Sequence, residues 1–148
     1  MAASFIEQIM YKATEKKLEE LCAKNVKTEH LVSLSHGRTG SYDFFAEING
    51  CLFGFEILCR PTKGKLKEKL DYLPYVDRYV FVIPSNSLSL YKRNVTKAFG
   101  PVTRPKFFPS EFNNKKICLW LCDIEKRKIT VCSRFSKVMN VLVKKGND

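Results

Sequence analysis

A single acidic residue, Glu56, interrupts an otherwise apolar stretch of the chain. Residues 51–59 read CLFGFEILC, and every other member of the stretch is apolar or glycine. A run of this composition is typical of a strand that is buried on both faces. Burying a carboxylate without a partner costs several kcal/mol, or the group takes up a proton. Glu56 is therefore a candidate for chemistry, and the elements around it must supply its partner.

A second carboxylate is brought to Glu56 by the expected hairpin turn. The dipeptide Asn49-Gly50 is the sequence most favoured in two-residue hairpin turns, and it fixes the register of the strands on either side. Counted outward from this turn, Asp43 lies directly opposite Glu56. Cross-strand partners share one sheet face, where two like charges destabilise the pair. A divalent metal ion would compensate both charges, so the register predicts a metal site.

Two other arrangements are compatible with the same residues. A β-bulge would shift the register and separate Asp43 from Glu56. Alternatively, a buried lysine or arginine would pair with Glu56 and neutralise it. Both alternatives predict a structural role for Glu56 in place of a metal site.

The elements that position these residues predict an α/β protein. Apolar residues recur at helical spacing over residues 4–24, and again over residues 65–76, where lysines 65, 67 and 69 lie outside the apolar stripe. The order αβββαβ followed by a terminal β hairpin indicates an α/β sandwich with a central mixed sheet. The strands are expected at residues 28–34, 43–48, 51–59 and 78–84, the terminal hairpin over residues 117–134 with its turn at 125–127, and short helices within residues 88–99 and 135–143.

The composition indicates one domain with a polyanionic partner. The chain has 148 residues, enough to bury a core without disulfides or metals, so residues 1–148 are expected to form a single domain. Its 26 Lys and Arg against 15 Asp and Glu give a net charge of +11, far more than solubility requires. Nucleic acid is the commonest partner of such a chain, and a generally cationic surface is the alternative reading.

Other classes of function are disfavoured by the residue types present. The first 17 residues lack the uninterrupted apolar core of a signal peptide, and no run of about 18 apolar residues occurs, so we expect an intracellular, cytoplasmic protein with no membrane partner. The six cysteines form no CxxC pair, which favours reduced core thiols over a zinc site. With two histidines and no glycine-rich nucleotide motif, neither a catalytic triad nor nucleotide hydrolysis is supported.

The order of helix, strand, loop, Asp43, hairpin, Glu56, helix and the strand RYVFVIP resembles the PD-(D/E)XK nuclease superfamily. This superfamily includes archaeal Holliday-junction resolvases and many restriction endonucleases. The segment YLPYVDRYVFVIP is also similar to the helix-to-strand segment of its small DNA-repair members. The resemblance covers residues 15–84, and the terminal hairpin is compatible with it. It implies a restriction-endonuclease-like fold and Mg²⁺- or Mn²⁺-dependent hydrolysis of phosphodiester bonds in duplex or branched DNA.

The resemblance also implies roles for individual residues. Asp43 and Glu56 become the metal ligands. A glutamate of the first helix often assists in this superfamily, and Glu15 is the expected residue, with Glu7 as its competitor. The residues expected to contact nucleic acid are Arg38, Arg60, Lys63 and Lys65.

One position departs from the superfamily pattern. The residue two after the glutamate is usually a lysine that orients the attacking water, and here it is Leu58, which cannot do so. Arg60, Lys63 and Lys65 are the nearby cations that would substitute for it. The departure leaves two functions open, a metal-dependent endonuclease and a nuclease-fold protein that binds nucleic acid without cutting. DNA structure, DNA versus RNA and oligomeric state also stay open, although members that make paired cuts are commonly homodimers.

Overall fold

The computed structural model describes residues 5–60, 63–85 and 116–132. The helices expected within residues 88–99 and 135–143 lie outside the described residues. The described elements, in chain order, are α1 (Phe5–Glu20), β1 (Lys24–Ser33), the 3-10 turn η1 (Ser35–Gly37), β2 (Thr39–Ile48), β3 (Cys51–Ile57), α2 (Lys63–Glu68), the 3-10 helix η2 (Lys69–Tyr75), β4 (Arg78–Pro84), β5 (Ile117–Asp123) and β6 (Lys128–Cys132).

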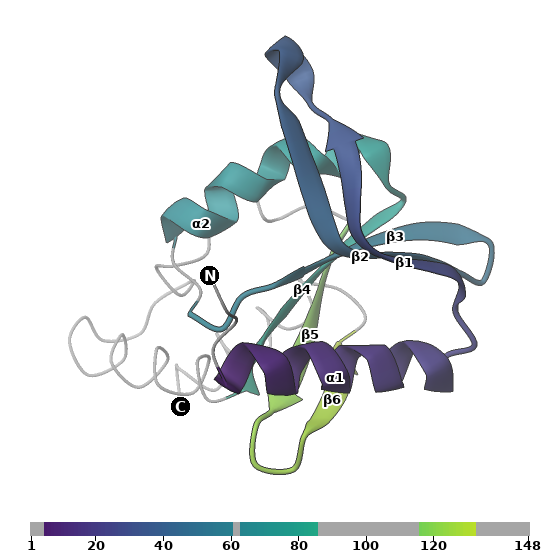
Figure 1. The fold of residues 1–148 in the computed structure, drawn as a ribbon, viewed down its shortest axis with the longest axis vertical. Coiled ribbons are helices and arrows are strands. Elements are labelled where there is room, and N and C mark those ends of the chain that lie inside the picture. Colours follow the sequence, from purple (N-terminus) through teal and green to yellow (C-terminus); the bar gives the residue numbers. More distant parts are fainter. Residues whose placement is uncertain (1–4, 61–62, 86–115, 133–148) are drawn as a thin grey trace, which may run out of the picture.

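The six strands form one mixed sheet whose spatial order is the same as their order in the sequence (Figure 1). The pairs β1–β2, β2–β3 and β5–β6 are antiparallel, whereas β3–β4 and β4–β5 are parallel. The parallel pair β3–β4 is connected through α2 and η2, because parallel neighbours need a crossover segment. The expected mixed α/β architecture, with an early hairpin, a crossover helix and a late hairpin, is confirmed.

Helices cover both faces of this sheet (Figure 1). On one face, α1 buries Met10 and Leu18 in a cluster with Phe55 and Trp120. On the other face, α2 and η2 bury apolar side chains against a second cluster that includes Tyr79 of β4. Because each face of β4 meets one of these clusters, all residues from 79 to 84 are buried, as its apolar sequence predicts.

The hairpin between β2 and β3 has the expected turn. Asn49 and Gly50 both adopt positive φ, at 52° and 79°, which is the backbone of a type I′ turn. The register is also the expected one, from the pair of Ile48 with Cys51 next to the turn to the pair of Phe44 with Phe55. The turn residues therefore determine which side chains of the two strands meet.

The two helices differ from the sequence expectation at their C-terminal halves. The first helix ends at Glu20 instead of residue 24, because Cys22 takes a left-handed φ of 57°. The Cys22 amide then donates to the carbonyl of Glu19, and the Ala23 amide donates to that of Leu18, both at 3.0 Å, which is the Schellman pattern of a helix end. The second helix tightens into the 3-10 helix η2 from Lys69 onward.

Candidate functional site

Asp43 lies at the point where β2 separates from β3. The regular ladder ends with the pair of Phe44 and Phe55, one pair before Asp43 and Glu56. Beyond it, Oδ2 of Asp43 accepts a hydrogen bond from the backbone amide of Ile57 at 2.7 Å. The Asp43 carboxylate thus takes the place that a backbone carbonyl of β2 would occupy, and it is fixed against β3.

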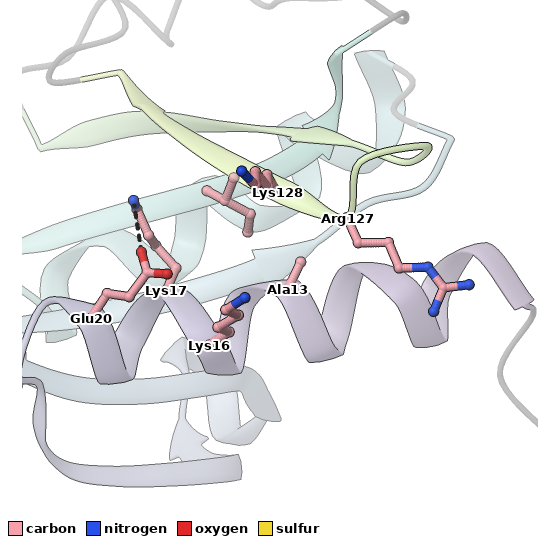
Figure 2. A pocket seen from close by; sticks show the side chains of 7 residues that line it. Ala13, Lys16, Lys17, Glu20, Arg127 and Lys128 are labelled. Carbon is pink, nitrogen blue, oxygen red and sulfur yellow. Dashed lines mark hydrogen bonds and ion pairs between the residues drawn. The ribbon is translucent and has the colours of Figure 1, made fainter.

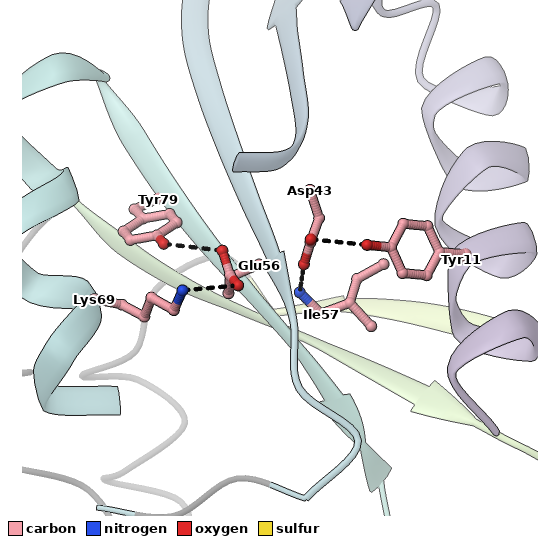
Figure 3. A network of polar contacts seen from close by, with 6 residues as sticks. All are labelled: Tyr11, Asp43, Glu56, Ile57, Lys69 and Tyr79. Atoms are coloured by element: carbon pink, nitrogen blue, oxygen red, sulfur yellow. Dashed lines mark hydrogen bonds and ion pairs between the residues drawn. The ribbon is translucent and has the colours of Figure 1, made fainter. Parts of the chain in front are cut away.

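The other oxygen of Asp43 is bound by the first helix. The Tyr11 hydroxyl of α1 donates a hydrogen bond to Oδ1 of Asp43 at 2.7 Å (Figure 3). Burial raises the pKa of the Tyr11 phenol, and the hydrogen bond to Asp43 raises that pKa further. The phenol therefore stays protonated and remains a donor at every physiological pH.

Glu56 is buried, with 7% of its surface exposed, and it has two partners on the α2 side of the sheet. Nζ of Lys69, from η2, lies 3.1 Å from Oε1 of Glu56. The Tyr79 hydroxyl of β4 donates to Oε2 of Glu56 at 3.4 Å. Figure 3 shows Glu56 turned toward Lys69 and Tyr79, whereas Asp43 is turned toward Tyr11 of α1. The expectation that the two carboxylates share one sheet face is therefore wrong, because the regular ladder ends one pair before them.

Burial raises the pKa of Glu56 to about 7, and the negative charge of Asp43 also raises it. The charge and hydrogen bond of Lys69, and the hydrogen bond of Tyr79, act in the opposite direction. For Lys69, burial lowers the pKa, but the charge and the hydrogen bond of Glu56, with the nearby Tyr72 and Asp43, together outweigh burial and the pKa rises. Lys69 is therefore a cation near neutral pH, where Glu56 exchanges its proton.

Of the alternatives left open by the sequence, the ion pair is the one that occurs, since a basic residue pairs with Glu56. The two carboxylates still interact, because the charge of Asp43 raises the pKa of Glu56. Within residues 5–60, 63–85 and 116–132, no group of three or more His, Cys, Asp or Glu side chains is arranged to hold a metal ion.

Lys69 was not among the cations expected near Glu56. The prediction that its side chain lies outside the apolar stripe was wrong. Lys69 stands three residues after Leu66 and four before Leu73, a spacing that places it beside the apolar stripe of a helix. It is the first residue of η2, and only 22% of its side chain is exposed.

Leu58 is a core residue in the cluster beneath α2, and its amide donates a hydrogen bond to the carbonyl of Val82 at 2.9 Å. Of the cations expected to substitute for a lysine at this position, Arg60 and Lys65 are exposed, and Lys63 is the first residue of α2. The cation that the structure places at Glu56 is Lys69.

The two candidate glutamates of the first helix are placed differently. Glu15 is exposed on α1. Glu7 of α1 lies near the residues that follow β3, where its Oε1 accepts a hydrogen bond from the Cys59 thiol at 3.4 Å. The structure thus brings Glu7, and not Glu15, close to the end of the strand that carries Glu56.

Arg38 lies on the same side of the sheet as Lys69. The two residues line a cavity of about 330 Å³ together with Leu34, Thr39, Glu68 and Tyr72. The guanidinium of Arg38 donates to Oδ2 of Asp71 at 2.6 Å, which ties the loop before β2 to η2. A recess lined by two cations and one carboxylate therefore opens beside the Glu56–Lys69 pair.

The chain matches no protein-family model, and no curated protein is similar enough to count as a relative. Among the described residues, no helix is both long and apolar enough to cross a membrane.

Proposed function

We propose that the protein is a metal-dependent endonuclease that hydrolyses phosphodiester bonds in DNA. The observation that carries the proposal is the contact between Lys69 and Glu56, because it supplies a cation beside the acidic residue in place of the motif lysine that Leu58 replaces. The superfamily pattern needs a cation near the glutamate, and η2 provides one from a neighbouring element.

The side chains fit a hard divalent cation in their chemistry. Mg²⁺ is commonly held by one or two carboxylates, with water and substrate phosphate oxygens completing its coordination, so a third acidic residue is not required. Asp43 and Glu56 are two such carboxylates on adjacent strands, and the negative charge of Asp43 raises the pKa of Glu56. When bound, Mg²⁺ or Mn²⁺ would polarise a phosphoryl oxygen and lower the pKa of a coordinated water.

The protein's own residues have separate tasks in this proposal. Tyr11 and the Ile57 amide orient Asp43. Lys69 carries the positive charge that stabilises the phosphoryl group as negative charge develops on it. Arg38, which lines the same recess as Lys69, binds an adjacent phosphate, since a guanidinium suits bidentate phosphate contacts. Glu7 replaces Glu15 as the assisting helix carboxylate.

The fold and the charge support the same proposal. The order of the described elements and the mixed sheet are compatible with a restriction-endonuclease-like arrangement. A net charge of +11 favours a polyanionic substrate such as DNA, and we expect the protein to meet it inside the cell.

A second candidate function is nucleic-acid binding without cleavage by a catalytically degenerate nuclease fold. It is favoured by the burial of Leu58 in the core and by the engagement of both Glu56 oxygens with Lys69 and Tyr79. In this case the ion pair stabilises the fold and no metal binds.

The two candidates are separated by incubating the protein with linear, nicked and four-way-junction DNA in Mg²⁺, Mn²⁺ or EDTA. An endonuclease cuts at least one substrate with metal, and both Asp43→Ala and Lys69→Met reduce cutting at least about a hundredfold. Glu15→Ala, an exposed change on α1, is the control and retains activity. Unchanged cleavage by Asp43→Ala shows that the assignment is wrong, and EDTA-insensitive binding without cutting selects the second candidate.

A further inference from the structure

A hollow with a cationic rim lies between α1 and the turn that joins β5 to β6 (Figure 2). Its volume is about 190 Å³. Its floor is formed by Ala13 of α1 and Ile129 of β6, which are only 6% and 8% exposed. The remaining lining residues are Lys16, Lys17, Glu20, Arg127 and Lys128.

The rim carries an excess of positive charge. Four cations and one carboxylate line the hollow, which leaves a local charge of +3. The carboxylate, Glu20, is paired with Lys17 at 3.2 Å. In the part of the chain that the structure describes, no ion pair joins a carboxylate to Lys16, Arg127 or Lys128, so three of the cations that line the hollow carry no such partner.

Secondary structure fixes both walls of the hollow. Lys16 projects from α1, which packs on β6. The opposite wall is a tight turn, in which the amide of Lys126 donates to Oδ1 of Asp123 at 3.0 Å, and the backbones of Asp123 and Lys128 face each other in the ladder of β5 and β6. Arg127 extends from this turn along α1 (Figure 2). The cations are thus held by different elements around a shared space.

We infer that this hollow is a binding site for a phosphate group, either as a free anion or as part of a nucleic-acid backbone. A phosphate offers oxygens in several directions, and cations from two sides satisfy them with charge-assisted hydrogen bonds. The side chains of the floor, Ala13 and Ile129, are apolar, so the charged groups of the lining stand at the rim. The volume of about 190 Å³ accommodates a phosphate together with ordered water.

This site is separate from the proposed catalytic centre. The hollow lies on the α1 side of the sheet, whereas Glu56 and Lys69 meet on the α2 side. Phosphate binding here requires neither a metal nor cleavage, and the inference therefore stands or falls independently of the proposed function. A polynucleotide bound at both places would contact the protein through two distinct faces.

The test is a titration of the full chain, labelled with ¹⁵N, with inorganic phosphate and separately with a short DNA duplex at low salt. We expect saturable amide shifts at Ala13, Arg127, Lys128 and Ile129. Whichever of the two ligands shifts these amides should bind the double variant Lys16→Ala/Arg127→Ala on the order of tenfold more weakly than the wild type. The matched control Lys12→Ala/Lys126→Ala removes two exposed cations of the same elements that do not line the hollow, and it should bind nearly as tightly as the wild type.

The arms of the titration distinguish the two sources of phosphate. Saturation by inorganic phosphate supports a free anion as ligand, and shifts with the duplex alone support a backbone phosphate. The inference is overturned if neither ligand shifts these amides, or if the folded double variant binds as tightly as the control variant. Loss of metal-dependent cleavage in Asp43→Ala bears on the catalytic proposal alone and leaves this result unaffected.

Discussion

Lys69 and Glu56 form an ion pair on the α2 side of the sheet, with Nζ 3.1 Å from Oε1 and only 22% and 10% of the two side chains exposed. Water screens such a pair less than it screens a surface pair, so each charged group is stabilised mainly by its partner. Glu56 also has the charge of Asp43 nearby, which acts against its ionisation. The site is therefore a balance of one cation against two carboxylates.

Replacing Lys69 by methionine should lower the free energy of unfolding by about 1 to 3 kcal/mol near pH 8, because it leaves Glu56 buried without a cation. The pKa of Glu56 should rise above about 7, since Lys69 is a main cause that lowers it. Urea unfolding near pH 8 and near pH 5 measures the effect, which should be smaller at the lower pH, where Glu56 is protonated. The exposed Lys67→Met is the control, and an equal loss in both variants would contradict a specific role for Lys69.

Glu56 should also make stability depend on pH. Its pKa of about 7 in the folded protein lies above the ordinary 4.5, so the folded state binds this proton more tightly than the unfolded state. The stabilisation is complete below about pH 4.5 and is lost as the pH rises through about 7. At about 1.4 kcal/mol per pKa unit, the loss is at most about 3.5 kcal/mol.

Glu56→Gln removes this titration, so the difference between wild type and variant isolates it from other groups. Urea unfolding between pH 4 and pH 8 should show a flatter profile for Glu56→Gln, while Glu15→Gln follows the wild type. Parallel profiles of the wild type and Glu56→Gln would mean that Glu56 titrates alike in the folded and unfolded states.

Asp43→Asn should lower the pKa of Glu56 below about 7, because the negative charge of Asp43 is the second cause of its elevation after burial. Asparagine still offers an oxygen to the Ile57 amide, so the change removes charge with little change of shape. Carboxyl ¹³C titration by NMR measures the pKa directly. Glu47→Gln, on the same strand, is the control, and a pKa unaffected by Asp43→Asn would leave burial as the sole cause.

Gly54 should be intolerant of any side chain. A Cβ at this position in β3 would lie 2.5 Å from the ring of Tyr42, which packs across the glycine. Gly54→Ala should therefore cost about 1 to 3 kcal/mol in thermal or urea unfolding. Gly64→Ala, in α2, meets no atom within 4 Å and should be neutral or slightly stabilising. A harmless Gly54→Ala would show that Tyr42 moves aside easily.

The sequence was most informative where local chemistry determines the backbone. Asn49-Gly50 specifies a type I′ turn, and the turn specifies the register down to the pair of Phe44 and Phe55. The central strand β4 was equally predictable, since its uninterrupted apolar residues suit burial on both faces.

The features that the sequence did not reveal depend on tertiary contacts and on where a helix ends. Lys69 stands at helical spacing from Leu66 and Leu73, at the border of the apolar stripe, but only the packing of η2 on the sheet shows that its partner is Glu56. The first helix ends at a left-handed Cys22, a position that usually takes glycine, so no end signal was present. Tyr11 offered one usable signal, because a phenol beside the apolar face of a helix usually has a polar partner, and here that partner is Asp43.

Each of the described strands β2 to β6 pairs with the described strand before it, and this has a consequence for folding. Strands β1, β2 and β3 are close together in the sequence, whereas β4 ends at Pro84 and β5 begins at Ile117. Pairing residues that are close in sequence costs less chain entropy than pairing distant ones, so the first three strands should assemble before β5 and β6 join the sheet. Pulsed hydrogen exchange should therefore protect the amides around Asp43 and Glu56 early, before the last hairpin completes the sheet.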